Sequence, residues 1–134
     1  MKGIADTGFL VAFANRRDLH FPWAHALAQQ IHEPLLTCEA VLAETAFHLK
    51  NSRLVLRLIE TGLVKVDFEL ENHLPEMTML AERYAERQPD LADLCLIRMS
   101  ELNPKHPVVT VDGDFRIYRR HRREVIPVIM PRER

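Results

Sequence analysis

Short apolar runs alternate with longer helix-like stretches from one end of this chain to the other. The expected strands cover residues 3–5, 35–37, 63–68, 108–111 and 125–129. Because a helix-like stretch separates most neighbouring strands, the pattern favours parallel strands joined by right-handed crossovers. It therefore predicts an α/β fold of three layers, in which helices cover both faces of a central, mostly parallel sheet of short strands.

The helix-like stretches combine apolar residues at helical spacing with recognisable end signals. Pro22 suits a first helical turn, Ser52 and Asp90 can cap helix starts, and Gly62 can end a helix. The expected helices are 9–15, 22–30, 39–50, one from Ser52 to Gly62, 70–87 with a kink or later start at Pro75, one from Asp90 to Leu102, and 115–123.

The length of 134 residues is typical of one domain, so we expect a single unit over residues 1–134. Cys38 and Cys95 lack the spacing of a zinc site, which favours two reduced thiols. Asp6 interrupts any signal-peptide core, and the apolar stretch at 8–14 is too short to cross a bilayer. We therefore expect a cytoplasmic protein that does not enter a membrane.

The charges are unevenly distributed, although the formal net charge is only −1. Residues 116–134 contain seven arginines and two glutamates, a balance of +5, so the rest of the chain carries −6. This asymmetry is expected where one part binds phosphates and another collects cations. A solvated arginine-rich helix face explains the basic end equally well.

Four acidic residues point to one edge of the predicted sheet. Asp6 follows the first strand and Asp112 follows the strand at 108–111. Glu44 and Asp93 interrupt apolar surroundings on two predicted helices, where a buried acid needs a positive partner. In parallel sheets, ligands bind beyond the carboxyl ends of the strands. We therefore expect these acids to meet there, although each alone could cap a helix or face solvent.

Carboxylates crowded together repel one another, which raises the pKa of at least one of them. A divalent cation removes this cost, and oxygen-only ligands suit Mg²⁺ or Mn²⁺ rather than zinc. Such a cation leaves coordination positions for water and for a phosphate group. The acidic set therefore favours hydrolysis of a phosphodiester.

The ordered motifs of the chain resemble those of the PIN domain family over residues 4 to about 128. The matching segments are Asp6-Thr7-Gly8-Phe9-Leu10, Asp18-Leu19-His20 with His25 and Ala26, Leu42-Ala43-Glu44, Asp90-Leu91-Ala92-Asp93, and Thr110-Val111-Asp112-Gly113-Asp114-Phe115. Each motif is weak by itself, but the set in this order is specific.

The resemblance implies a Mg²⁺- or Mn²⁺-dependent endoribonuclease with Asp6, Glu44, Asp93 and Asp112 as its acidic site. Asp6 and Asp93 are the expected metal ligands. By the same carry-over, Thr7 and Thr110 support the site, Asp90 caps its helix, and Glu39 is left open. Asp114 is expected to support the site, with the roles of metal ligand and of cap for the helix from Phe115 left open. Arg116, Arg119 and Arg120 are predicted to bind the RNA backbone.

The short chain is most similar to VapC-type toxins of toxin–antitoxin pairs. This likeness implies an RNA substrate, a cognate antitoxin and a homodimer. Trp23 and Tyr118 are weaker candidates for stacking on bases, and His20, His25 and His48 for moving protons.

Other functions remain open at this stage. A catalytically silent PIN module could bind RNA or a protein, and a single-strand DNA nuclease would use the same acids. A receiver-like signalling domain is disfavoured, because no lysine follows the strand at 108–111 in the required place.

Overall fold

The computed structural model describes residues 1–132, so Glu133 and Arg134 of the basic end lie outside the described residues. Its main sheet has five parallel strands in the order β3-β2-β1-β4-β7. They are β1 (Ile4–Ala5), β2 (Leu35–Thr37), β3 (Val64–Val66), β4 (Val108–Val109) and β7 (Val128–Ile129). The predicted α/β architecture with a short-stranded parallel sheet is confirmed.

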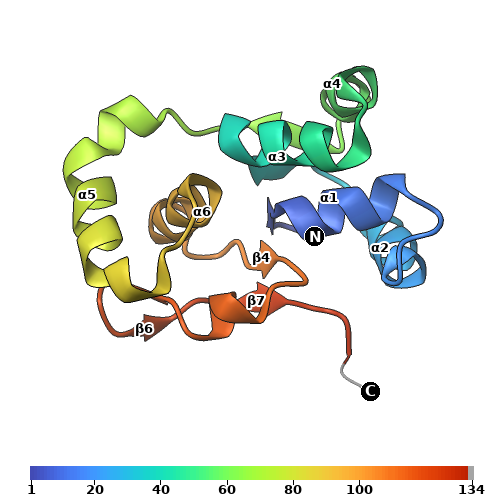
Figure 1. The fold of residues 1–134 in the computed structure, drawn as a ribbon. Helices are drawn as coiled ribbons and strands as arrows, with labels where there is room; N and C mark the ends of the chain where they lie inside the picture. Colours follow the sequence, from blue (N-terminus) through green and yellow to red (C-terminus); the bar gives the residue numbers. More distant parts are fainter. Residues whose placement is uncertain (133–134) are drawn as a thin grey trace.

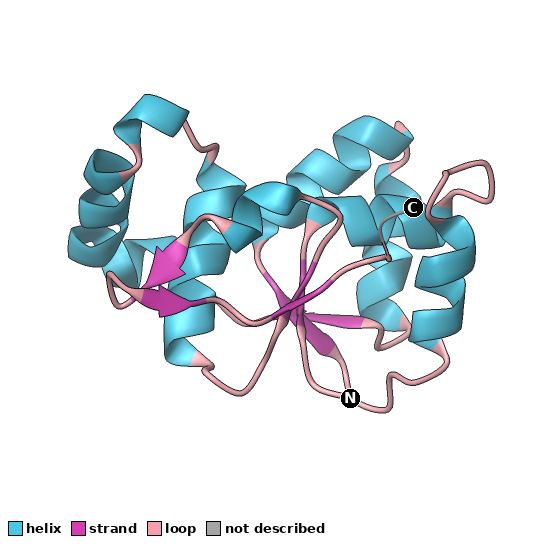
Figure 2. Ribbon diagram, turned by 90° about the horizontal axis from the view of Figure 1, so that it is seen from below, coloured by secondary structure: helices cyan, strands magenta, loops and turns pink. Residues whose placement is uncertain are grey.

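In the described part of the chain, six α-helices and three 3₁₀ turns connect the strands. The helices are α1 (Thr7–Ala14), α2 (Phe21–Ala28), α3 (Glu39–Leu49), α4 (Ser52–Glu60), α5 (Leu74–Arg83) and α6 (Leu91–Leu102), and the 3₁₀ turns are η1 (Leu70–His73), η2 (Ala85–Arg87) and η3 (Gly113–Arg116). Figure 1 shows α5 and α6 on one side of the molecule and α1, α2 and α4 on the other, and Figure 2 shows helices flanking the sheet. Within residues 1–132, each helix is too short or too polar to span a bilayer.

The strand order places a topological switch point beside β1. From β1 the chain moves to β2 and β3 on one side, and it then returns to β4 on the other side. Ile4 pairs with Leu36 of β2 and with Val108 of β4, so β1 is the central strand. Ligands of open parallel sheets bind where the chain order reverses. The carboxyl ends of β1 and β4 are therefore the part of this fold suited to hold a ligand.

Several predicted element ends differ from the structure. The helix expected from Ser52 is capped by Asn51, whose Oδ1 accepts a hydrogen bond from the Leu54 amide at 3.0 Å. The helix expected at 70–87 is divided into η1, α5 and η2, because Pro75 has no amide hydrogen and suits the first turn of a helix that begins at Leu74.

The predicted helix at 115–123 is wrong. After η3 the chain forms an antiparallel hairpin of β5 (Arg119–Arg120) and β6 (Glu124–Val125). The connection turns at His121 and Arg122, whose φ angles of 47° and 73° lie in the left-handed region. Hydrogen bonds with the end of α6 hold this hairpin and outweigh the local helical pattern.

Arg120 is the main anchor of the hairpin, since it is only 5% exposed. Its Nη1 donates to the Ser100 carbonyl at 3.0 Å and to the Pro104 carbonyl at 3.3 Å. Its Nε donates to Glu124 at 3.0 Å. For residues 119–125, which form the hairpin, the alternative of a solvated arginine-rich helix face is therefore wrong.

Replacing Arg120 should destabilise the fold far more than replacing a neighbouring exposed arginine. We expect Arg120→Met to lower the free energy of unfolding by about 2–3 kcal/mol, because it leaves buried carbonyl groups without a donor. Arg123 is exposed, so Arg123→Met should change it by less than about 0.5 kcal/mol. Urea unfolding measures both values, and equal losses would contradict the anchoring role of Arg120.

Candidate metal centre

An open cleft of about 330 Å³ lies at the carboxyl ends of β1 and β4. Its walls come from the start of α1, the loop before α2, α3, the start of α6 and the segment after β4. The lining residues are Asp6, Thr7, Gly8, Val11, Asp18, His20, Glu44, His48, Asp90, Asp93, Val111 and Asp112. The cleft is strongly acidic, and none of these residues is a lysine or an arginine.

Asp6 is fixed at the floor of the cleft. It follows β1 and is the N-cap of α1, where its Oδ1 accepts a hydrogen bond from the Thr7 amide at 2.7 Å. Its Oδ2 accepts one from Thr110 Oγ1 at 2.6 Å, across the junction with β4. Gly8 allows this close approach, because a Cβ there would collide with Val111 Cγ2. The end of β1 is thus tied directly to the end of β4.

Thr7 joins Asp6 to the opposite wall of the cleft. Its hydroxyl donates a hydrogen bond to Glu44 Oε1 at 2.8 Å. Glu44 lies in the middle of α3 and is partly buried. The hydroxyls of Thr7 and Thr110 thus each donate a hydrogen bond to a carboxylate of the cleft.

Asp93 enters the cleft from the first turn of α6, where it is 9% exposed. Asp90 caps this helix as predicted, and its Oδ1 accepts a hydrogen bond from the Asp93 amide at 2.8 Å. The hydroxyl of Tyr118 donates to Asp93 Oδ2 at 2.9 Å. Burial raises the pKa of Tyr118, so this phenol stays protonated and able to donate.

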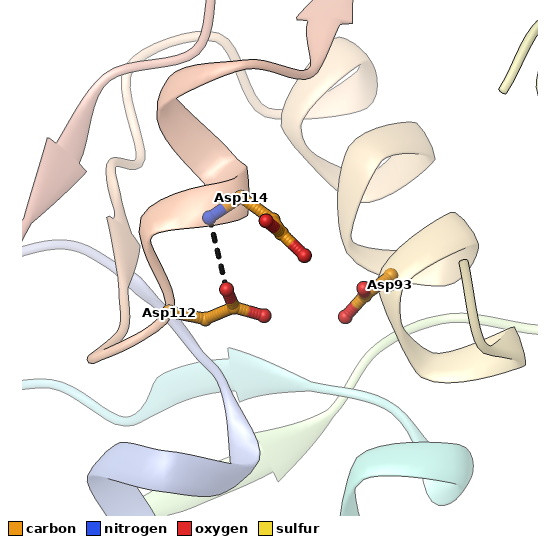
Figure 3. A group of neighbouring side chains, drawn as sticks. All are labelled: Asp93, Asp112 and Asp114. Atoms are coloured by element: carbon orange, nitrogen blue, oxygen red, sulfur yellow. Dashed lines mark hydrogen bonds between the residues drawn. The ribbon is translucent and has the colours of Figure 1, made fainter. Parts of the chain in front are cut away.

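Asp93, Asp112 and Asp114 form the group best placed to bind a cation. One carboxylate oxygen from each lies within 4.8 Å of the others, and Figure 3 shows the three side chains directed toward one another. The Asp114 amide donates to Asp112 Oδ1 at 2.9 Å, which fixes the loop between them. Asp114 Oδ1 also contacts Arg87 Nη2 at 3.2 Å, on the exposed side of the group.

Keeping the carboxylates of the cleft ionised costs free energy. Burial, together with repulsion from Asp112 and Glu44, raises the pKa of Asp6 to about 6 despite its two hydrogen bonds. Burial and the nearby Asp90 raise the pKa of Asp93 to about 7. Burial also raises the pKa of Glu44. A cation in the cleft would relieve this cost.

The donor set fits a hard divalent cation such as Mg²⁺ or Mn²⁺. All three ligands offered by Asp93, Asp112 and Asp114 are carboxylate oxygens. Opposite ligands of Mg²⁺ lie about 4.2 Å apart, since each bond is about 2.1 Å long. The separations between these oxygens do not exceed 4.8 Å, so small movements of the side chains suffice for shared coordination.

The four acids proposed from the sequence, at positions 6, 44, 93 and 112, all line this one cleft. The three-carboxylate group, however, contains Asp114 and not Asp6. Both oxygens of Asp6 accept hydrogen bonds from Thr7 and Thr110. Asp114 thus lies closer to a candidate cation position than its predicted supporting role implied.

The basic residues proposed to bind RNA lie in different environments. Arg116 is exposed, whereas Arg119 is partly buried and its Nη1 donates to the backbone carbonyls of 116–118. Arg120 is buried against α6, which argues against a surface role for it. Tyr118 is also buried and cannot stack on a base, so that expectation is wrong.

Sequence reasoning gave too little weight to three other residues of the cleft. The sequence indicates Asp90 only as a helix cap, and His20 and His48 only as weaker candidates for moving protons, yet all three line the cleft. The spacing of Asp90, the N-cap, and Asp93, in the first turn, brings both acids to the start of α6, which is a usable signal in the sequence. His25 instead stacks on Phe21, and Trp23 packs against Phe9.

Comparison with known proteins agrees with this geometry. The sequence model of one family, described as PIN domain, matches residues 4–120, which is well over half of the chain. The comparison with curated proteins found no match.

The raised pKa of Asp93 predicts a pH-dependent effect of replacing it. Between about pH 4 and pH 7, Asp93 is protonated in the folded state but ionised in the unfolded chain. The free energy of unfolding therefore falls as the pH rises through this range. In EDTA, Asp93→Asn should therefore gain stability relative to the unmodified protein over this range. Thermal unfolding at each pH measures the difference, and a constant difference would contradict the raised pKa. Saturating Mn²⁺ should remove or reverse the gain, because it stabilises the protein that retains the ligand.

Proposed function

The chain belongs to the PIN domain family, and we propose that it is a Mg²⁺- or Mn²⁺-dependent endoribonuclease that acts as the toxin of a toxin–antitoxin pair. The observation that carries the nuclease proposal is the group of Asp93, Asp112 and Asp114, whose oxygens lie within 4.8 Å in an acidic cleft. The fold is of the nuclease type, and the acidic set expected of such an enzyme is intact.

The residues of the cleft divide into ligands and supports. Asp93, Asp112 and Asp114 would hold the cation, and Asp6 adds negative charge beside them on the floor of the cleft. The chemistry that a bound Mg²⁺ or Mn²⁺ supplies is neutralisation of phosphate charge and activation of a water molecule. The cleft is open to solvent, so a nucleic-acid backbone can reach these side chains.

Glu44 is suited to accept a proton during hydrolysis. Its Oε1 is held by the Thr7 hydroxyl at 2.8 Å, which orients the carboxylate. Its raised pKa brings it closer to neutral pH, where a general base works well. In this scheme a water molecule attacks the phosphorus, its proton passes to Glu44, and the bond from phosphorus to the leaving oxygen breaks. The leaving oxygen takes up a proton from solvent, which reaches the open cleft.

Cleavage assays test the proposed reaction. We expect the purified chain to cut single-stranded RNA with Mg²⁺ or Mn²⁺ and to lose this activity in EDTA. Asp112→Asn should reduce the rate at least about 100-fold, because it removes a cation ligand, and Asp6→Asn should also abolish cleavage. Glu33→Gln is the control, since Glu33 is exposed and precedes β2 at the opposite end of the sheet.

A DNA strand of the same sequence distinguishes the alternatives. Preferential cleavage of the DNA would replace the ribonuclease with a single-strand DNA nuclease. Binding of RNA without any cleavage under these conditions would instead favour a catalytically silent PIN module.

The toxin role rests on the resemblance to VapC-type proteins, which also implies a cognate antitoxin and a homodimer. Exposed apolar residues such as Leu19 and Phe47 suit contact with a protein partner. Sedimentation of the purified chain tests the dimer.

Induced expression in a bacterial host tests the toxin role. The unmodified chain should arrest growth, whereas Asp112→Asn at an equal protein level should not, because arrest depends on cleavage. If growth continued although the expressed enzyme was folded and active, the protein would be a nuclease but not a toxin.

A further inference from the structure

Tyr118 is one of the largest buried side chains of the protein, at 1% exposed. A buried hydroxyl group requires a hydrogen-bond partner. Its partner is a carboxylate of the candidate metal centre, since Tyr118 Oη donates to Asp93 Oδ2 at 2.9 Å. Asp93 lines the cleft, whereas the buried Tyr118 is not among the lining residues.

This hydrogen bond restricts how Asp93 can present itself to a cation. A carboxylate with no fixed partner rotates about its Cβ–Cγ bond and loses that freedom when it binds a metal. Tyr118 holds Oδ2, which leaves Oδ1 and the remaining lone pairs for coordination. Partners of this kind orient metal ligands and contribute to affinity.

Tyr118 is itself rigidly held. Its ring makes edge contacts with Tyr84 and Phe115, with centroids 5.1 Å and 5.3 Å apart. The next residue, Arg119, donates its amide hydrogen to Tyr84 Oη at 2.8 Å. The following residue, Arg120, is anchored to the end of α6, the helix that carries Asp93.

We propose that Tyr118 is a positioning residue for the cation site, and that the anchored hairpin of β5 and β6 serves to hold it against Asp93. The basic segment that carries Tyr118 then influences the cation site through a buried hydrogen bond, in addition to any contact of its arginines with a substrate. This inference rests on the cation site of the proposed function, but it does not depend on RNA being the substrate.

Tyr84 provides a matched control, because it belongs to the same aromatic pair. Its hydroxyl also makes a hydrogen bond in the same region, but with the backbone of Arg119 and not with a carboxylate. Tyr118→Phe and Tyr84→Phe each remove a single oxygen atom. A difference between them therefore reports the contact with Asp93 and not the packing of the rings.

The test is Mn²⁺ binding to the full chain without RNA, measured by calorimetry, with thermal unfolding as a check on folding. We expect Tyr118→Phe to weaken Mn²⁺ binding about 10-fold or more. Tyr84→Phe should stay within about 2-fold of the unmodified protein. In an Asp93→Asn background, adding Tyr118→Phe should have no further effect on affinity, because the carboxylate it orients is gone.

Unchanged Mn²⁺ affinity in a folded Tyr118→Phe protein would overturn the proposal. So would an equal loss in Tyr84→Phe, which would show that loosening the hairpin is sufficient. Absence of Mn²⁺ binding by the unmodified chain would overturn both this proposal and the metal site. Mn²⁺ binding that depends on Tyr118 in a chain that cuts no RNA would support this proposal while rejecting the ribonuclease.

Discussion

Bringing several carboxylates together at one edge of the sheet costs free energy, and this cost determines which groups surround them. Burial and mutual repulsion raise the pKa of Asp6 to about 6 and that of Asp93 to about 7. The fold offsets part of this cost with neutral donors: the Thr7 amide, the Thr110 hydroxyl and the Tyr118 hydroxyl. Because these donors carry no formal charge, the cleft keeps its net negative charge and its attraction for a divalent cation.

The topology explains why these residues meet although they are far apart in the sequence. Asp6 follows β1, and Asp112 follows β4. These two strands are neighbours only because the chain returns across β1 after forming β3. The Thr110 hydroxyl spans this junction, since it donates to Asp6 and accepts from the Asp112 amide at 2.9 Å. Thr110 lies directly after the end of β4 at Val109, where a strand reaching residue 111 was predicted. The site and the sheet are therefore stabilised by the same contacts.

Sequence patterns within short segments predicted the helices and strands whose formation depends mainly on neighbouring residues. The alternation of strands and helices identified the parallel sheet, and strand-end acids indicated the edge where Asp6 and Asp112 lie. The segment from 115 to 123 could not be predicted in this way. Its apolar spacing suggested a helix, but the hydrogen bonds of Arg120 and the left-handed turn at His121 depend on the distant end of α6. The contact of Tyr118 with Asp93 depends on the same hairpin, so it was hidden from sequence reasoning too.

The placement of the arginines follows from the same electrostatic requirement. An arginine paired directly with Asp93 or Asp6 would neutralise the charge that a divalent cation needs, and it would fill the space that the cation occupies. Arg120 instead donates a hydrogen bond to the Ser100 carbonyl at the end of α6 and forms an ion pair with Glu124. Arg87 contacts Asp114 only at the exposed side of the acidic group, where water weakens the pair. Within residues 1–132, Arg120 thus holds the hairpin against the helix that carries Asp93, and the residues that line the cleft include no lysine or arginine.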